Sequence, residues 1–150
     1  MQVTFGKHDG RSVEFLMLKE PGYVHWLIQE SPSGALLAVK HHAQSLMKKF
    51  DAKPFHRACH GRNCTASATR ATVYGTSLAP YWWCDNCDPY EAGANDGKLQ
   101  GVRTYGQALN HVEFYCAGRK SDYVALIKYL AEAKGLPARV GEKQANAFFV

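Results

Sequence analysis

Two close pairs of cysteines in the middle of the chain constrain its fold more than any other feature. Cys59 and Cys64 are separated by four residues, nineteen residues follow, and Cys84 and Cys87 then form a Cys-x-x-Cys motif. A tetrahedral zinc site takes four such ligands from two tight turns that face each other. We therefore predict that Cys59, Cys64, Cys84 and Cys87 bind one structural Zn²⁺, with no open position for a catalytic water.

Other uses of these residues remain open. Two disulfides would need an oxidising compartment, and the segment that begins at Met1 lacks the pattern of a secretory signal. The second pair could serve in redox chemistry, although no thioredoxin-like strand and helix surround it. His60 could replace one thiol as a ligand, but Cys59 and Cys64 already complete a set of four thiolates. From the missing signal we expect a cytoplasmic protein.

The residues between the cysteine pairs predict a β-hairpin. Residues 68–74 alternate and are β-branched, Gly75 and then Pro80 mark the turn, and Tyr81, Trp82 and Trp83 form the returning strand. The expected unit is a zinc ribbon, in which two cysteine turns clamp one end of a small antiparallel sheet. Because side chains alternate across a strand, Trp82 and Trp83 face opposite sides. One ring covers the core, and the other, with Tyr81, is available to stack on a base; the sequence does not say which is which.

Helical periodicity lies on both sides of this unit. We expect helices over 21–30 and 35–50, the second with one apolar face, and a third over 121–134 that Ser121 caps. The apolar positions are Leu36, Val39, Ala43, Leu46 and Phe50 in the second helix and Val124, Ile127, Leu130 and Ala131 in the third. Residues 142–150 form either a terminal helix or a packed tail.

The other segments predict shorter elements. The first thirteen residues suggest a short hairpin with a turn at His8–Gly10, and residues 105–110 a short helix. Residues 112–116 predict a buried strand that carries Cys116 into the core. Residues 88–106 predict a loop, because they contain glycines and little hydrophobic periodicity. These glycines are Gly93, Gly97, Gly101 and Gly106.

These elements predict an α+β fold, with a small zinc-ribbon hairpin inserted between helical segments and a short N-terminal hairpin. The expected units are 1–50, 55–90 and 105–150, packed as one compact domain. The chain has 150 residues, of which 46% are hydrophobic, and this share excludes a largely disordered chain. No window approaches the roughly 18 uninterrupted apolar residues of a membrane-spanning helix.

The formal net charge of +5 is compatible with a polyanionic partner. Lys7, His8 and Arg11 surround a glycine turn where backbone N–H groups and cationic heads could hold a phosphate. In the alternative interpretation the glycines only shape a hairpin, and these side chains are solvated. Tyr23 and Trp26, three residues apart, favour a core role over a stacking role.

The N-terminal residues resemble a small module at the C-terminus of exodeoxyribonuclease X and in related short bacterial proteins. The matching residues are Phe5-Gly6-Lys7-His8, Gly10-Arg11-Ser12-Val13, Pro21-Gly22-Tyr23 and His25-Trp26-Leu27, within residues 3–29. The resemblance implies an accessory, DNA-contacting unit beside DNA-processing enzymes. It does not imply the nuclease reaction, because no paired carboxylates suited to two-metal chemistry stand out.

The leading hypothesis is a non-catalytic, zinc-stabilised nucleic-acid-binding protein, an accessory factor of bacterial or phage DNA metabolism, with DNA favoured over RNA. The residues expected to contact nucleic acid are Lys7, His8, Arg11, Arg62, Arg70, Tyr81, Trp82 and Trp83. The alternative is a zinc-ribbon adaptor for a protein partner, which an exposed apolar patch around Trp82 or Trp83 would favour. An enzyme that uses His41, His42 or His56 is a third hypothesis, but no catalytic constellation supports it.

Overall fold

The computed structural model describes residues 1–88 and 98–150 and shows a mixed arrangement of helices and one antiparallel sheet. This confirms the α+β class. The N-terminal part contains a 3₁₀ turn and three α-helices, and the C-terminal part three more. In chain order the elements are η1 (Gly6–His8), α1 (Val13–Lys19), α2 (Pro21–Gln29), α3 (Gly34–Ala52), β1 (Arg70–Tyr74), β2 (Ser77–Trp83), β3 (Leu99–Val102), α4 (Tyr105–Tyr115), α5 (Lys120–Ala133) and α6 (Glu142–Phe148).

The helices on either side of the sheet follow their apolar stripes. In α3, Val39, Ala43, Leu46 and Phe50 are buried on one face, as their spacing predicts. Proline occupies the first position of α2, where its missing N–H has no intrahelical partner to lose. The predicted cap of α5 is wrong. This helix begins at Lys120, and its N-cap, Arg119, makes no side-chain capping bond.

The predicted β-hairpin is present and forms part of a larger sheet. The predicted turn is too long, because β2 already begins at Ser77 and contains Pro80. The strand order is β2-β1-β3, and β1 pairs antiparallel with both neighbours. Gly75 lies in the turn between β1 and β2 with a φ of 53°, a conformation that glycine adopts without strain. The predicted loop over 88–106 is wrong at residues 99–102, which form β3. The predicted loop glycines Gly93 and Gly97 lie outside the described residues.

The C-terminal third corrects a second prediction, because residues 112–116 belong to a helix instead of a strand. Thr104 and Gln107 form a capping box that starts α4, and the helix then continues to Tyr115. Val112 and Cys116 lie four residues apart on its buried side, while Phe114 is 79% exposed. Cys116 is therefore a core residue, as expected, but at the end of a helix. The segment over 142–150, left open between helix and tail, contains α6.

The N-terminal residues form a very short pairing followed directly by a helix. Gln2 and Ser12 make an isolated antiparallel bridge around η1. Ser12 caps α1 by accepting a hydrogen bond from the backbone N–H of Phe15. Its hydroxyl also donates to Glu142 of α6, so the two ends of the chain lie together.

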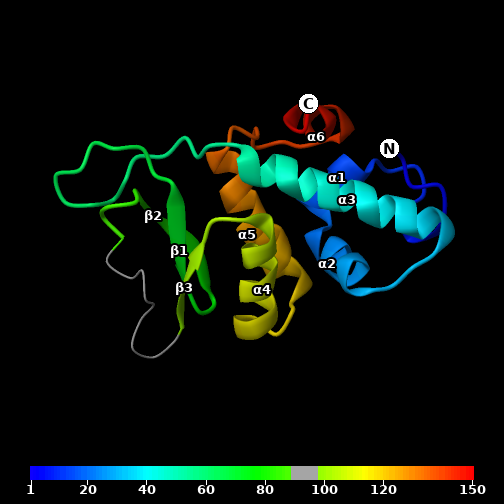
Figure 1. The fold of residues 1–150 in the computed structure, drawn as a ribbon, viewed down its shortest axis with the longest axis horizontal. Coiled ribbons are helices and arrows are strands. Elements are labelled where there is room, and N and C mark those ends of the chain that lie inside the picture. Colours follow the sequence, from blue (N-terminus) through cyan, green and yellow to red (C-terminus); the bar gives the residue numbers. More distant parts are fainter. Residues whose placement is uncertain (89–97) are drawn as a thin grey trace.

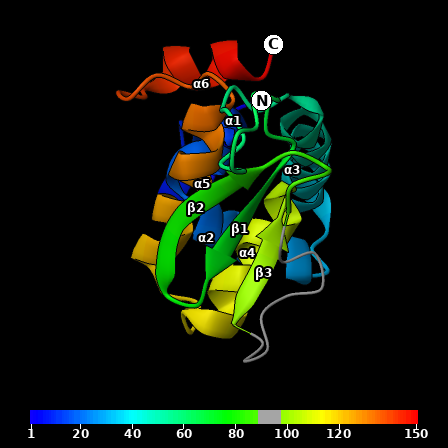
Figure 2. The same ribbon diagram turned by 90° about the vertical axis from the view of Figure 1, so that its left-hand side faces the viewer.

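A single cluster of buried hydrophobic side chains extends from Val3 to Phe149. Figure 1 shows the helices of the N-terminal part at one end of the molecule and the sheet at the other. In Figure 2 the helices α4 and α5 lie behind the sheet, and no labelled helix covers the face turned to the viewer. Among the described residues, no helix has the length and apolar character needed to cross a membrane.

Candidate metal centre

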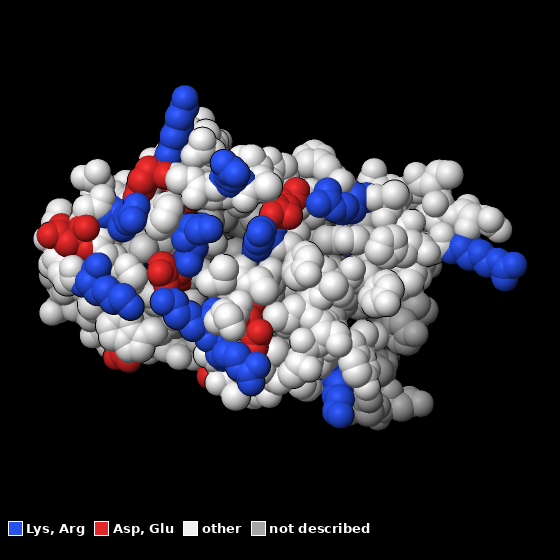
Figure 3. All heavy atoms as spheres, turned by 180° about the vertical axis from the view of Figure 1, so that it is seen from behind, with Lys and Arg blue, Asp and Glu red and all other residues white. Residues whose placement is uncertain are grey.

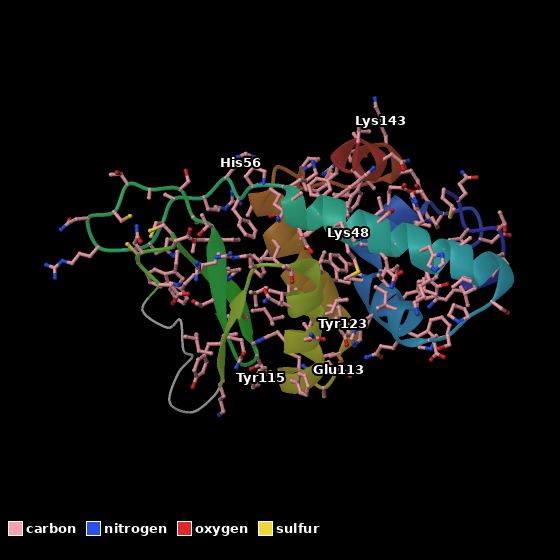
Figure 4. The ribbon with its side chains drawn as sticks, in the orientation of Figure 1. Lys48, His56, Glu113, Tyr115, Tyr123 and Lys143 are labelled. Atoms are coloured by element: carbon pink, nitrogen blue, oxygen red, sulfur yellow. The ribbon has the colours of Figure 1, made fainter. Side chains whose placement is uncertain are left out.

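Four cysteines meet at the end of the β1–β2 hairpin. Cys59 and Cys64 lie in the loop between α3 and β1, and Cys84 and Cys87 directly follow β2. Their four Sγ atoms all lie within 4.8 Å of one another, and those of Cys64 and Cys84 are 3.9 Å apart. All five cysteines of the chain are free thiols, so the two pairs are not disulfides. These four residues could bind a metal ion. In Figure 4 the sulfur atoms drawn in yellow at the left belong to the loops at this end of the molecule.

Local backbone pairing shapes the first cysteine turn. Ala58 and Ser67 form an antiparallel bridge, and the N–H of Cys59 donates to the carbonyl of Ala66 at 2.9 Å. At the tip, Asn63 has a φ of 56°, which asparagine tolerates better than most residues. Position 61 must be a glycine, because a Cβ there would lie only 2.7 Å from Sγ of Cys87. The six-residue turn therefore closes over the other pair only because this position lacks a side chain.

Backbone N–H groups point at the sulfur atoms. The N–H groups of Gly61 and Cys84 both donate to Sγ of Cys59 at 3.3 Å. The backbone N–H of Asn86 lowers the pKa of the Cys84 thiol to about 7, whereas hydrogen bonds with the thiols of Cys84 and Cys64 raise the pKa of Cys87 to about 12. Four sulfurs this close cannot all carry a negative charge without a cation between them, so the cluster suits a divalent metal.

His60 is held against the sheet by hydrogen bonds to strand β2. Its ring Nδ1 accepts a hydrogen bond from the backbone N–H of Trp82 at 3.1 Å. The backbone N–H of His60 donates to the carbonyl of Trp82 at 2.8 Å. The imidazole ring also contacts the rings of Tyr81 and Trp83 edge-on. The group of residues placed to hold a metal consists of the four cysteines, without this histidine.

Asp85, between the second pair of cysteines, fastens that turn to the sheet. Its Oδ1 accepts hydrogen bonds from the hydroxyl of Thr69 at 2.6 Å and from the guanidinium of Arg70 at 2.7 Å, and Arg103 lies 3.4 Å away. The Thr69 hydroxyl and the Arg70 guanidinium together hold the pKa of Asp85 below its usual range. Arg70 also lies 4.0 Å from Asp88. The charge of Arg70 is thus largely compensated within the protein.

The two faces of the hairpin differ, and this difference assigns the two tryptophans. Trp82 is 6% exposed and packs on Phe55, so it belongs to the core. Trp83 lies on the opposite face, half-buried, and its indole N–H donates to the Thr72 hydroxyl at 2.9 Å. Tyr81, opposite Thr72 in the sheet register, shares that outer face and is 59% exposed.

The structure divides the other predicted contact residues between two ends of the molecule. Arg62 is exposed in the first cysteine turn, at the end of the molecule that holds the metal centre. Lys7 and His8 lie in η1, at the far end (Figure 1). Arg11 is turned toward α6, where its guanidinium lies 3.9 Å from Glu142 and 4.7 Å from the centre of the Phe15 ring.

The histidines of the enzyme hypothesis do not form one site. His42 is paired with Glu14, with 2.7 Å between Nε2 and Oε1. His41 and His56 are exposed, His56 in the segment that follows α3. One residue expected in the core is instead on the surface, because Trp26 is 46% exposed. Its spacing from Tyr23 could not separate a core role from a surface role, since both rings lie at one edge of the buried stripe.

Comparison of the chain with protein-family models, with curated proteins and with solved structures finds no match.

Proposed function

We propose that this chain is a non-catalytic nucleic-acid-binding protein, in which a structural Zn²⁺ holds one end of the sheet and the open sheet face binds a single strand. The four cysteines would hold the metal, and the outer-face rings would stack on bases. Only the N-terminal resemblance over residues 3–29 favours DNA over RNA. The same resemblance alone favours a role as an accessory factor in bacterial or phage DNA metabolism.

The chemistry of the donor set supports zinc. Four thiolates form the usual ligand set of a structural zinc site, in which Zn–S distances of about 2.3 Å place the sulfurs about 3.8 Å apart. The separation of 3.9 Å between Cys64 and Cys84 agrees with this geometry. A site with four protein ligands leaves no position for a reacting water, so the metal would stabilise the two turns without taking part in catalysis. The whole hairpin end would then be the zinc ribbon that the cysteine spacing predicts.

The observation that carries the proposed function is the exposed ring of Tyr81 beside Trp83 on a sheet face that no described helix covers. Aromatic side chains on an open sheet face offer flat surfaces on which unpaired bases stack whatever their sequence. Gly101 lies opposite Thr72 on the same face, and a Cβ there would meet nothing within 4 Å. The open space on this face therefore lies at the edge strand β3, whereas Thr72 on the central strand is buried.

Uncompensated positive charge lies in and just before the first cysteine turn. Arg62 is exposed, and no described residue is placed to neutralise it by an ion pair. Arg57 is also exposed, and its guanidinium donates to the carbonyl of His56, which leaves its charge uncompensated. Arg70 and Arg103 share Asp85, so they position the second cysteine turn more than they attract phosphate. Arg62 and Arg57 are the groups expected to contact the backbone of a strand.

Fluorescence anisotropy with labelled oligothymidine, a DNA duplex and an RNA of equal length tests this proposal. We expect binding to the single-stranded DNA that weakens steeply with added salt. Substitution Tyr81→Ala should weaken binding about tenfold, a typical loss for one stacked base. Tyr129→Ala is the matched control, because Tyr129 is 42% exposed on α5, away from this face.

Arg62→Gln should reduce the slope of log affinity against log salt by about one unit. Absence of binding to every nucleic acid at low salt would refute the proposal. The adaptor alternative gains no support from the tryptophans, since Trp82 is buried and Trp83 is half-buried. It would replace the proposal if the chain bound no nucleic acid and co-purified with a single protein partner.

A further inference from the structure

A groove at the end of the molecule opposite the metal centre combines lysines with exposed rings. It consists of two adjoining hollows, of about 310 Å³ and about 200 Å³, which share Lys7, His8 and Tyr23. We call it the Lys7 groove. Its walls come from η1, from α2 and from the loop and first turn of α5, so residues more than 90 positions apart in the sequence meet there.

The larger hollow is cationic. Lys7 and Lys120 both line it, together with one carboxylate, Glu20, whose Oε2 lies 3.4 Å from Nζ of Lys120. No described acidic side chain forms an ion pair with Lys7. Burial and the nearby cations Lys7, Lys120 and Arg11 lower the pKa of His8, against the opposing effect of Glu20. When His8 is neutral, the charges of this hollow are those of Lys7 and Lys120 and the opposing charge of the Glu20 carboxylate.

Tyr123 brings a polar group with no described partner into the same hollow. Its side chain is 5% exposed, it lines the hollow, and its hydroxyl makes no hydrogen bond with any described residue. Two glycines leave space for this ring. A Cβ at Gly22 would lie 3.2 Å from Cδ2 of Tyr123, and one at Gly118 would lie 3.5 Å from its hydroxyl. Figure 4 labels Tyr123 at the junction of α2 and α5. Because Tyr123 lines the hollow, its hydroxyl is placed to donate a hydrogen bond to a ligand that binds there.

The smaller hollow is aromatic. Trp26, 46% exposed, and Phe5, 36% exposed, line it beside the shared Tyr23. The rings of His8, Tyr23 and Trp26 form a series, with centroids 4.6 Å and then 5.7 Å apart. A planar group in this hollow would lie against the indole of Trp26, directly beside the cationic hollow.

We infer that the Lys7 groove binds a nucleotide unit, with its phosphate between Lys7 and Lys120 and its base against Trp26. The hydroxyl of Tyr123 donates to a phosphate oxygen. Anionic and planar groups joined in one ligand match the cationic and the aromatic hollow. Figure 3 shows Lys and Arg side chains over the helical half of the molecule, interspersed with Asp and Glu. This inference does not depend on whether the sheet face binds nucleic acid.

Titration of the purified chain with dAMP, with inorganic phosphate and with a 5′-phosphorylated and an unphosphorylated oligodeoxyadenylate tests the inference, with tryptophan fluorescence and calorimetry as readouts. We expect Lys7→Gln and Lys120→Gln each to weaken dAMP binding at least tenfold. Trp26→Ala should weaken dAMP binding without changing the affinity for inorganic phosphate. The matched control is Lys128→Gln, since Lys128 is exposed two turns further along α5 and pairs with Glu132 outside the groove.

The oligonucleotides distinguish a free nucleotide from the end of a strand. Binding of the 5′-phosphorylated strand but not of dAMP would assign the groove to a strand end, and binding of both would assign it to the nucleotide unit itself. Absence of binding to dAMP and to both strands, equal binding of dAMP and inorganic phosphate, or an unchanged affinity in Lys7→Gln would overturn the inference. Tyr81→Ala should leave dAMP binding intact, so failure of the sheet-face proposal and failure of this inference are separable.

Discussion

Gly61 determines whether the two cysteine turns can approach each other. A Cβ at this position would lie 2.7 Å from Sγ and 2.8 Å from Cβ of Cys87, which is closer than such atoms pack. Its own N–H also donates to Cys59. The cysteine spacing alone marks this residue only as turn-forming, because the contact that forbids a side chain comes from the other pair.

We expect Gly61→Ala to weaken metal retention about tenfold or more, because one of the two turns must move away. Competition with a chromophoric chelator measures this loss. The control is Gly101→Ala, where the added methyl group meets open space, and its metal retention should match that of the unmodified chain. Equal retention in the two variants would show that the turns are not as close as described.

Lys134 joins the ends of α3 and α5. It is buried, and its Nζ donates to the carbonyls of Phe50 and Lys53 at 2.8 and 2.6 Å, between the rings of Phe50 and Phe55. Lys134→Met keeps the apolar stem and removes both bonds, so we expect a loss of about 1–3 kcal/mol in the free energy of unfolding. Urea denaturation measures the loss. An unchanged midpoint and slope would mean that the amine contributes nothing to stability.

The same lysine predicts a pH dependence. Burial lowers the pKa of Lys134 to about 8, below its value of about 10.4 in an unfolded chain. Between these values the unfolded chain holds a proton that the folded chain has released, so the free energy of unfolding rises with pH across this window. Other groups titrate there as well, so the test is the difference between the unmodified chain and Lys134→Met. The rise should be smaller in the variant.

At the scale of elements, α4 shows how a local signal competes with strand propensity. Residues 112–116 are rich in β-branched and aromatic side chains, yet the capping box at Thr104 and Gln107 starts a helix that includes all but the last of them. The pattern Thr-x-x-Gln is visible in the sequence and could have predicted this helix. Burial of Val112 and Cys116 on one side then fixes it against the core.

Thr104→Ala should therefore lower the free energy of unfolding by about 0.5–2 kcal/mol, the usual cost of removing an N-cap. Ser121→Ala serves as the control, because the sequence predicts a cap there and α5 instead begins at Lys120. Thermal denaturation followed by circular dichroism compares the two. A larger effect at Ser121 than at Thr104 would favour the sequence-based boundary of α5 over the structural one.

Local patterns thus predict part of the fold. The cysteine pairs, the hairpin with its opposite-facing tryptophans and the apolar stripe of α3 all follow from spacing and alternation. The strand β3 could not be predicted. Its four residues, flanked by charged or polar neighbours, are too few to show periodicity, and the strand forms by pairing with β1. The role of Asp85 and the assembly of the Lys7 groove depend on residues distant in the sequence, and no local pattern contains such contacts.

For the whole molecule, the core and the metal centre should differ in their response to metal removal. The helices share a buried cluster that extends from Val3 to Phe149, whereas the turns at 57–69 and 84–88 contain few core residues beyond the cysteines themselves. Metal ligation is expected to supply much of the local folding energy there. After chelation we expect amide hydrogen exchange to increase in residues 57–88 while α3 and α5 remain protected. Equal deprotection of both parts would mean that the metal holds the entire fold.

The most direct test of the account is X-ray absorption at the zinc edge on the purified chain, normalised to protein concentration. We predict one zinc ion per chain, surrounded by four sulfur ligands at about 2.3 Å. A sample without stoichiometric zinc, or zinc surrounded by nitrogen and oxygen ligands, would contradict it.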